Sequence, residues 1–248
     1  MKIIAIGGGE IGRPGYPVET TKIDREIINL SGKENPKVLF IPTASSDSES
    51  YFEVVKKHFG KRLGCKTNVL YLIKEKLTKK QIEEKVFNSD IVYVGGGNTA
   101  KLMKIWRKTG TDKILKEAGK KGIVLSGISA GSICWSKYGL SDSRRFNNPN
   151  AEMIKVSGLE LINIVYCPHY DFEPHRKEGL KKMMKKTSGV AIAMENCSAL
   201  EIIDDKYRII SSKKNVNAYK VYWKKNKFYE ENIKQEKEFK SLSEILVK

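Results

Sequence analysis

The sequence is poor in the features that mark membrane proteins and disulfide-rich secreted proteins. No apolar run approaches the roughly 18–20 residues that a membrane span requires. The four cysteines are scattered without a pair spacing, which favours free thiols in a reducing compartment. No basic stretch, apolar core and cleavage site follow one another at the beginning of the sequence. These absences predict a cytoplasmic protein without a membrane partner.

Internal repeats, low-complexity tracts and clear linkers are also missing. Of the 248 residues, 40% are hydrophobic and 30% are charged, as in an ordinary globular protein. A chain of this length can bury a substantial core, and its length is compatible with one large domain or two small ones. We treat residues 1–248 as a single α/β domain.

Acidic residues are scarce relative to basic ones, with 29 Asp and Glu against 46 Lys and Arg and a formal net charge of +17. Such an excess can bind nucleic acid through phosphate contacts. The lysines, however, alternate with glutamates over many expected helices and lack interleaved aromatic residues. We favour a solvated surface that attracts anionic substrates, and we keep a non-catalytic or nucleic-acid-binding α/β protein as the alternative function.

Short, apolar, β-branched segments alternate with amphipathic segments over the first half of the chain, which predicts a mostly parallel sheet with helices on both faces. The strands are expected at 2–6, 37–41, 67–72, 91–94 and 123–125, and the helices at 19–30, 48–63, 78–87, 99–108 and 111–120. Beyond residue 195 the spacing changes to short strands joined by turns, which predicts C-terminal antiparallel hairpins. These strands are expected at 198–203, 207–211, 216–223 and 227–230.

Residues 127–131, with the sequence G-I-S-A-G, form the most informative motif. They follow the apolar run 123–125 and precede residues 132–137, which we predict to begin a helix. A sharp turn between strand and helix presents a nucleophilic serine, here Ser129. Such a serine needs a base for its proton and N–H donors for the developing oxyanion. The N–H of Ala130 is one candidate donor, and the glycine loop 95–99 is expected to supply a second.

The base must come from three histidines, His58, His169 and His175. His58 lies in an amphipathic stretch and is expected on the surface. His175 follows a proline near the start of an expected helix at 177–186, which favours a position at its entry. His169 follows the apolar run 161–166, and therefore stands at a strand end, where open parallel sheets build their sites.

An acid that orients the imidazole would complete the constellation. Glu195 ends the apolar run 189–194, although its position is equally typical of a charged residue that begins a turn. A metal site is a further hypothesis for the segment that follows the predicted strand, but the spacing there matches no strong ligand signature. Its potential ligands are His169, Asp171, Glu173 and His175. We expect neither a metal nor a cofactor.

These segments, in this order, resemble the dipeptidase E (aspartyl dipeptidase) family of serine peptidases, to which the cyanophycinases are related. The matching segments are V-G-G-G-N-T at 94–99, G-I-S-A-G at 127–131, C-P-H-Y at 167–170 and A-M-E-N at 193–196. The resemblance implies a three-layer α/β sandwich similar to that of class I glutamine amidotransferases. It also implies a set of roles: Ser129 is the nucleophile, His169 the base, Glu195 the orienting acid, and Gly97 and Ala130 the oxyanion donors.

The order serine, histidine, acid argues against a lipase or esterase, in which the acid lies between the other two. The family's best-known activity is cleavage of dipeptides with an N-terminal aspartate, so the resemblance implies a small-peptide substrate and an acyl-enzyme. A cation should then bind the substrate carboxylate. Arg176 is similar in placement to the family's substrate-binding arginine, and we also assign Asn98 to substrate binding. The segment between His169 and Arg176 is shorter than in aspartyl dipeptidases, which leaves the specificity open.

Residues 7–12 offer a rival hypothesis, because their sequence G-G-G-E-I-G matches the loop that binds dinucleotides. That loop opens a helix directly, so that the pyrophosphate meets the helix N-terminus. Residues 13–17 contain two prolines and a glycine, which break a continuous helix. We therefore expect a glycine loop at the end of the first strand, where it can border the site.

Overall fold

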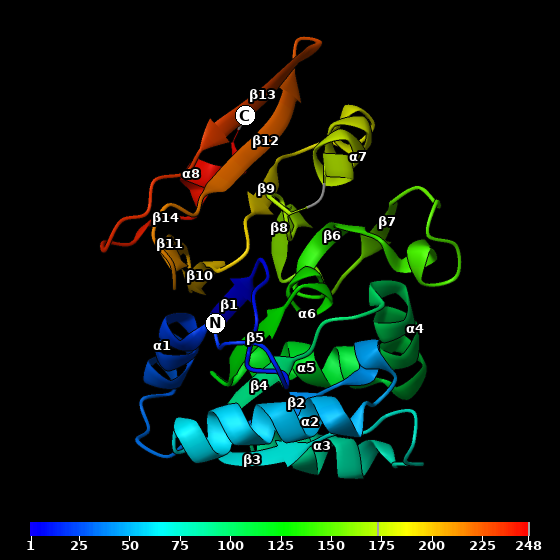
Figure 1. The fold of residues 1–248 in the computed structure, drawn as a ribbon, viewed down its shortest axis with the longest axis vertical. Helices are drawn as coiled ribbons and strands as arrows, with labels where there is room; N and C mark the ends of the chain where they lie inside the picture. Colours follow the sequence, from blue (N-terminus) through cyan, green and yellow to red (C-terminus); the bar gives the residue numbers. More distant parts are fainter. Residues whose placement is uncertain (173, 248) are drawn as a thin grey trace.

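The computed structural model describes residues 1–172 and 174–247, which form two β-sheets that meet along one apolar core (Figure 1). The larger sheet contains five parallel strands in the order β3-β2-β4-β5-β1. Their bounds are β1 (Lys2–Ile6), β2 (Lys37–Ile41), β3 (Lys66–Val69), β4 (Ile91–Val94) and β5 (Val124–Ile128). The carboxyl ends of β1, β4 and β5 therefore lie side by side, where the candidate site begins.

Antiparallel strands extend this sheet beyond β1. β10 pairs with β1, β11 with β10, and the short β14 with β11. Their bounds are β10 (Ser198–Ile203), β11 (Lys206–Ser211) and β14 (Lys240–Ser241). The β10–β11 hairpin is one of the expected C-terminal hairpins.

The second sheet has the order β13-β12-β9-β8-β6-β7 and lies above the first in Figure 1. Its central strands β6, β8 and β9 run parallel, while β7, β12 and β13 pair antiparallel. The bounds are β6 (Ser136–Ser141), β7 (Ile154–Ser157), β8 (Ile162–Cys167), β9 (Ala191–Met194), β12 (Ala218–Lys224) and β13 (Lys227–Asn232). A second expected hairpin, β12–β13, thus belongs to this sheet.

Helices cover both faces of the larger sheet because its strands are apolar on both sides. In β2, for example, Val38 and Phe40 face α1 and α2, whereas Leu39 and Ile41 face α3, α4 and α5. The helices on the two faces are α1 (Thr21–Ser31), α2 (Glu49–Val55) with the π-helix η2 (Lys56–Arg62), α3 (Lys79–Phe87), α4 (Thr99–Thr109) and α5 (Thr111–Lys120). The remaining helices are η1 (Thr43–Ser45), α6 (Ala130–Ile133), η3 (Ser143–Phe146), α7 (Pro174–Lys185) and α8 (Ser243–Leu246).

The core joins the two sheets into one body. Side chains of β1, β5 and β10 pack in the same apolar cluster as those of β8 and β9. The hydroxyl of Tyr166 on β8 donates to the carbonyl of Ala5 on β1 at 2.8 Å, so the sheets are also hydrogen-bonded to each other. α7 covers the outer face of the second sheet, where Leu180 and Met184 pack on Val165.

The predicted α/β class, with a parallel sheet covered on both faces and antiparallel C-terminal strands, is confirmed. One local prediction is wrong: residues 132–137 do not form a long helix after the G-I-S-A-G turn. α6 ends at Ile133, and β6 begins at Ser136. The mainly apolar run 132–135 is buried whichever element it forms, so its composition does not distinguish the two. Within the described residues, the helices are too short or too polar to cross a bilayer.

Candidate active site

Ser129 occupies the turn between β5 and α6 with an unusual backbone. Its φ of 57° and ψ of −114° lie in a region that residues other than glycine rarely adopt. The turn is held by a hydrogen bond from the Ser129 N–H to the carbonyl of Ile6, at 3.2 Å. Strain of this kind concentrates at functional sites. The Ser129 side chain is half-buried and lines a cavity.

His169 follows β8 and brings its imidazole to this serine. Nε2 of His169 lies 2.8 Å from Oγ of Ser129. His169 also has a positive φ, of 55°, and its N–H donates to the carbonyl of Gly7 at 3.0 Å. Two residues 40 positions apart are therefore joined within hydrogen-bond distance, the spacing that a nucleophile and its base require.

Asn196 contacts the other nitrogen of the imidazole. Nδ1 of His169 lies 2.7 Å from Oδ1 of Asn196. Because the amide oxygen only accepts, Nδ1 is the protonated nitrogen in this arrangement and Nε2 is left to accept the serine proton. An asparagine serves this orienting role in cysteine peptidases of the papain type.

Glu195, the acid expected from the sequence, points elsewhere. Its Oε2 accepts the N–H of Asn217 at 2.6 Å, and its Oε1 accepts the hydroxyl of Tyr219 at 3.0 Å. The chain turns directly after β9, where the N–H of Ser198 donates to the carbonyl of Glu195 at 3.3 Å. This turn directs residue 196 toward the imidazole and residue 195 toward Asn217 and β12.

The glycine loop after β1 packs directly on the imidazole. A Cβ at Gly8 would lie 1.9 Å from Oδ1 of Asn196 and 2.4 Å from Nδ1 of His169, so only glycine fits there. The carbonyl of Gly8 accepts the N–H of Cys197 at 2.8 Å. The loop does not open a helix: α1 begins only at Thr21. The segment thus holds the His169–Asn196 pair and lacks the helix N-terminus of a dinucleotide site.

The second glycine loop lies against Ser129. A Cβ at Gly96 would lie 3.4 Å from the Cβ of Ser129 and 3.8 Å from its Oγ. The next residue, Gly97, has a φ of 134°, and the Gly97 N–H has no acceptor among the residues that the structure describes. Ala130 is the first residue of α6, so its N–H has no acceptor within the helix. Ala130 thus follows Ser129 directly, and Gly97 follows the glycine that packs on the Ser129 side chain.

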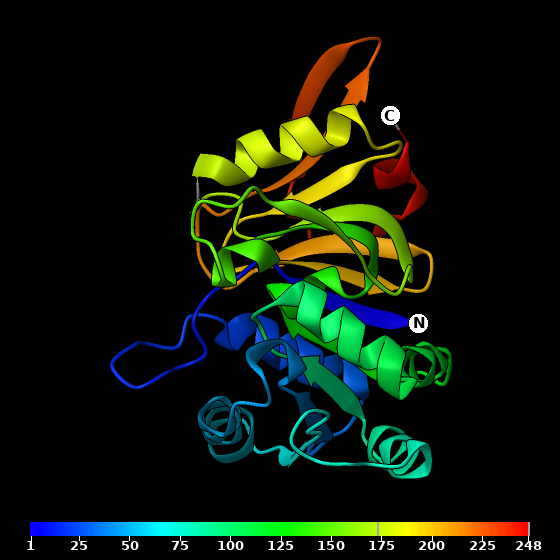
Figure 2. The same cartoon turned by 90° about the vertical axis from the view of Figure 1, so that its right-hand side faces the viewer.

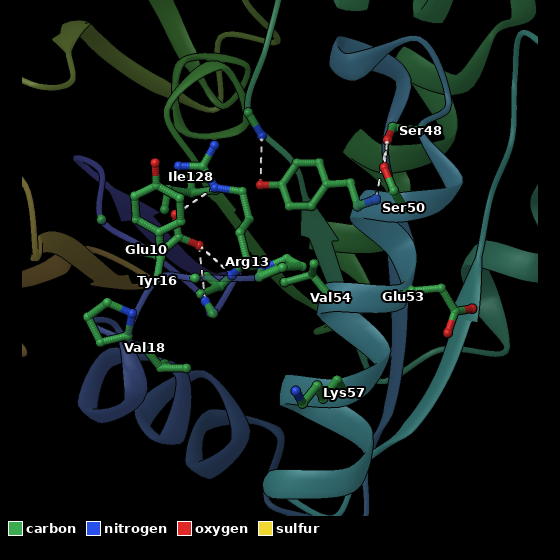
Figure 3. A pocket seen from close by; sticks show the side chains of 18 of the residues that line it. Glu10, Arg13, Tyr16, Val18, Ser48, Ser50, Glu53, Val54, Lys57 and Ile128 are labelled. Atoms are coloured by element: carbon green, nitrogen blue, oxygen red, sulfur yellow. Dashed lines mark hydrogen bonds and ion pairs between the residues drawn. The ribbon is translucent and has the colours of Figure 1, made fainter.

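A cavity of about 1220 Å³ opens in front of Ser129 and His169. One wall is the loop between β1 and α1, which projects from the body of the molecule in Figure 2. The opposite wall is formed by α2 and η2, which lie across the space from Glu10 and Arg13 (Figure 3). Apart from Ser129 and His169, the charged and aromatic residues that line it are Glu10, Arg13, Tyr16, Tyr51, Glu53, Lys57 and Arg62.

Glu10 fixes the conformation of the projecting loop. Its Oε1 accepts the N–H groups of Gly12 and Arg13 at 3.0 and 2.9 Å, and its Oε2 accepts Nε of Arg13 at 2.6 Å. Burial alone would raise the pKa of Glu10, but these hydrogen bonds and the Arg13 charge lower it. The Arg13 side chain remains 64% exposed, and its guanidinium carbon lies 5.1 Å from the centroid of the Tyr16 ring.

The two residues assigned to substrate binding do not line this cavity. Arg176 is buried, and its Nη2 lies 3.1 Å from Oδ2 of Asp142. Asn98 caps α4: its Oδ1 accepts the N–H of Lys101 at 2.9 Å, and its Nδ2 donates to the carbonyl of Ser143 at 3.1 Å. Both side chains support local structure in this conformation.

The other two histidines lie away from Ser129. His58 was expected on the surface, but it is buried and its Nε2 lies 2.8 Å from Oδ2 of Asp24. His175 is exposed on α7. Glu173, one of the four residues of the metal hypothesis, lies outside the described residues; elsewhere in the described chain, His, Cys, Asp and Glu side chains do not gather in a metal-binding group.

Comparison with known proteins shows the family of the chain. The model of peptidase family S51 matches residues 3–210, and the chain belongs to this family. It is therefore a peptidase of the serine type.

Individual relatives carry the same description. The uncharacterized peptidase YgaJ of Bacillus subtilis is 35% identical over 224 residues, which are 89% of this chain and 91% of the relative. Peptidase E of a Nostoc species is 26% identical over 217 residues, 83% of this chain and 84% of the relative. Among solved structures, a peptidase from an acI-B1 Actinobacterium superposes with a TM-score of 0.73 at 19% identity, covering 97% of this chain and 96% of that one. A putative peptidase E from Listeria monocytogenes gives 0.63 at 21% identity, over 85% and 98% of the two chains; these two structures show the shared fold.

Proposed function

We propose that this serine peptidase hydrolyses short peptides through an acyl-enzyme on Ser129, with His169 as its base and Asn196 as the residue that orients the imidazole. The observation that carries the proposal is the 2.8 Å contact between Ser129 Oγ and His169 Nε2 at the edge of an open cavity. Asn196 takes the role first assigned to Glu195 because its amide oxygen is bonded to Nδ1.

The reaction follows from this arrangement. His169 accepts the Ser129 proton as Oγ attacks the scissile carbonyl, and the oxyanion is held by the N–H groups of Gly97 and Ala130. The imidazolium then protonates the leaving amine, which releases the first product and leaves an ester on Ser129. A water molecule, deprotonated by His169, hydrolyses that ester and returns the serine.

For the substrate, we propose short peptides with an acidic N-terminal residue. The cavity carries the exposed cations Arg13, Lys57 and Arg62, and an arginine fork suits a carboxylate. Arg13 replaces Arg176 in this role, since Arg176 is buried against Asp142. The dispersed positive charge of the whole chain adds long-range attraction for an anionic peptide.

A dipeptide series that varies the first residue tests this specificity. We expect Asp-Leu and Glu-Leu to be cleaved faster than Asn-Leu, Gln-Leu and Ala-Leu. Arg13→Ala should raise KM for the acidic pair by roughly 10- to 100-fold, as expected for losing a charge-assisted hydrogen bond of about 1.5–3 kcal/mol. Arg25→Ala, an exposed arginine of α1 outside the cavity, is the matched control.

The outcomes separate the parts of the proposal. Equal rates for acidic and neutral first residues would reject the substrate class while leaving the serine mechanism intact. An acidic preference that survives in Arg13→Ala would transfer recognition to another cation. Hydrolysis that persists in Ser129→Ala would reject the mechanism itself.

A further inference from the structure

Tyr51, on α2, stands in the cavity wall and has no role in the mechanism described above. It lines the same cavity as Ser129 and His169. Its ring packs edge-on against Phe40 of β2, with centroids 5.0 Å apart and planes at 68°. Phe40 is fully buried, so the phenol is fixed by the core and its hydroxyl is held at a defined place.

The hydroxyl of Tyr51 contacts the loop that carries the proposed oxyanion donor. Its oxygen accepts the N–H of Gly96 at 3.3 Å. Gly96 is also the residue whose Cα hydrogens face the Ser129 side chain, since a Cβ there would lie 3.4 Å from Cβ of Ser129. The hydroxyl of Tyr51 therefore contacts the residue that precedes Gly97 and that also packs against Ser129.

The hydroxyl proton of Tyr51 makes no hydrogen bond to the described residues. Because the oxygen accepts from Gly96, the O–H bond must point in another direction, and no described residue accepts it. Burial is the main cause that raises the pKa of Tyr51, to about 12. The phenol is thus protonated at neutral pH, and it offers a hydrogen-bond donor in the wall of the cavity that Ser129 also lines.

We propose that the hydroxyl of Tyr51 is a third oxyanion donor, which hydrogen-bonds the substrate carbonyl oxygen as negative charge develops on it. The inference rests on the proposed peptidase mechanism. No proton is transferred to or from the phenol; it donates a hydrogen bond that strengthens as the carbonyl becomes an alkoxide. Such a donor stabilises the transition state more than the bound substrate, and therefore acts on kcat.

Tyr51→Phe tests the proposal, because it removes the hydroxyl and keeps the ring against Phe40. Loss of one oxyanion donor lowers kcat by about 10²- to 10³-fold, and we expect a fall of this size with KM changed by less than about 3-fold. Tyr71→Phe, which removes a phenol outside the cavity, is the matched control and should leave both constants unchanged.

A second readout separates donation from a purely structural role. An ester and the matching thionoester are compared in each variant, because sulfur accepts hydrogen bonds weakly and gains little from an oxyanion donor. Tyr51→Phe should slow the ester at least 10-fold more than the thionoester. The ratio of the two rates is independent of how much of the sample is folded, so the test holds even if the variant is less stable.

Each result has one meaning. A kcat within about 3-fold of the parent in Tyr51→Phe, or equal slowing of ester and thionoester, overturns the role of Tyr51 while the peptidase stands. Turnover by the parent that does not depend on Ser129 instead overturns the mechanism on which the inference rests.

Discussion

Two histidines of this protein, His58 and His169, each contact a polar partner, but of the two only His169 lines the cavity. His58 contacts Asp24, whose Oδ2 also accepts the hydroxyl of Thr20 at 2.6 Å, and all three side chains are at most 1% exposed. His169 lies between Asn196 and Ser129 at the edge of the cavity. Composition alone would favour the first group, which contains a hydroxyl, an acid and an imidazole.

The two groups differ in their access to the cavity and in the order in which their side chains are hydrogen-bonded. In the buried group the hydroxyl bonds the carboxylate, so the imidazole does not activate it. In the group at the cavity, the imidazole of His169 lies between the Ser129 hydroxyl and the Asn196 amide. The Ser129 side chain lines the cavity. The loop between β1 and α1 connects the two, since Gly8 packs on His169 and the loop ends at Thr20. Connectivity and burial, more than residue types, distinguish the group that we propose to be catalytic from the buried one.

Removing the hydroxyl of Ser129 should have the largest effect on the rate of peptide cleavage. Ser129→Ala deletes the nucleophile while the fold is kept, and kcat for a short peptide should fall by about 10⁴- to 10⁶-fold. The measurement is the initial rate of dipeptide cleavage at saturating substrate. Thr20→Val, which removes the hydroxyl of the buried group, should leave kcat per folded molecule near that of the parent.

Removing the buried imidazole should affect stability and spare catalysis. His58→Leu removes one of the two hydrogen-bond partners of the buried Asp24 carboxylate, and the loss of such a partner costs about 1–3 kcal/mol. The free energy of unfolding in urea measures this loss. Activity per active site, titrated with a covalent inhibitor, should stay within about 2-fold. A large fall in that activity would mean that the two groups are functionally coupled.

Variants of the neighbouring residues Asn196 and Glu195 test which of them orients the imidazole of His169. Asn196→Ala leaves Nδ1 of His169 without its acceptor, and a lost partner of about 1–3 kcal/mol corresponds to roughly a 10- to 100-fold lower kcat. Asn196→Asp should restore most of the rate, because a carboxylate also accepts from Nδ1. Glu195→Gln should change kcat less than Asn196→Ala does; the reverse order would return the orienting role to Glu195.

The smallest expected effect is that of Glu10 on the stability of the loop between β1 and α1, which forms one wall of the cavity. The pKa of Glu10 is lowered in the folded protein, so its contribution to loop stability is present above the ordinary value of 4.5 and is lost as pH falls through the lowered value. Glu10→Gln should mimic part of this loss at neutral pH. We expect faster amide hydrogen exchange at Gly12 and Arg13, whose N–H groups bond the carboxylate. Exchange unchanged from the parent would show that the loop is held without Glu10.

Much of the fold followed from the sequence because periodicity is strong there. β1, β2 and β4 are short apolar runs that are buried on both faces, and the helices between them carry amphipathic patterns. The second sheet was not expected as a separate unit. Its strand β6 follows α6 after only two residues, and nothing in a buried apolar run distinguishes a strand end from a helix start.

The site was partly predictable for a related reason. Motifs with backbone requirements, such as the turn at Ser129 and the glycine loop at 95–97, leave a sequence signal. Asn196 leaves no such signal in the sequence. The direction of its side chain after β9 depends on the register of β9 against β12. Arg13 and Tyr51 carry no motif and reach the cavity through tertiary packing. The burial of His58 depends on Asp24, 34 residues earlier, and was likewise invisible in its own segment.

Covalent labelling tests whether His169 activates Ser129 as the nucleophile. The protein is incubated with a fluorophosphonate probe, and the adduct is located by intact mass and peptide mapping. We expect a single adduct on Ser129, absent in Ser129→Ala and formed far more slowly in His169→Ala, while His58→Leu labels at the parent rate. Labelling that persists in Ser129→Ala, or that is insensitive to loss of His169, would contradict this expectation.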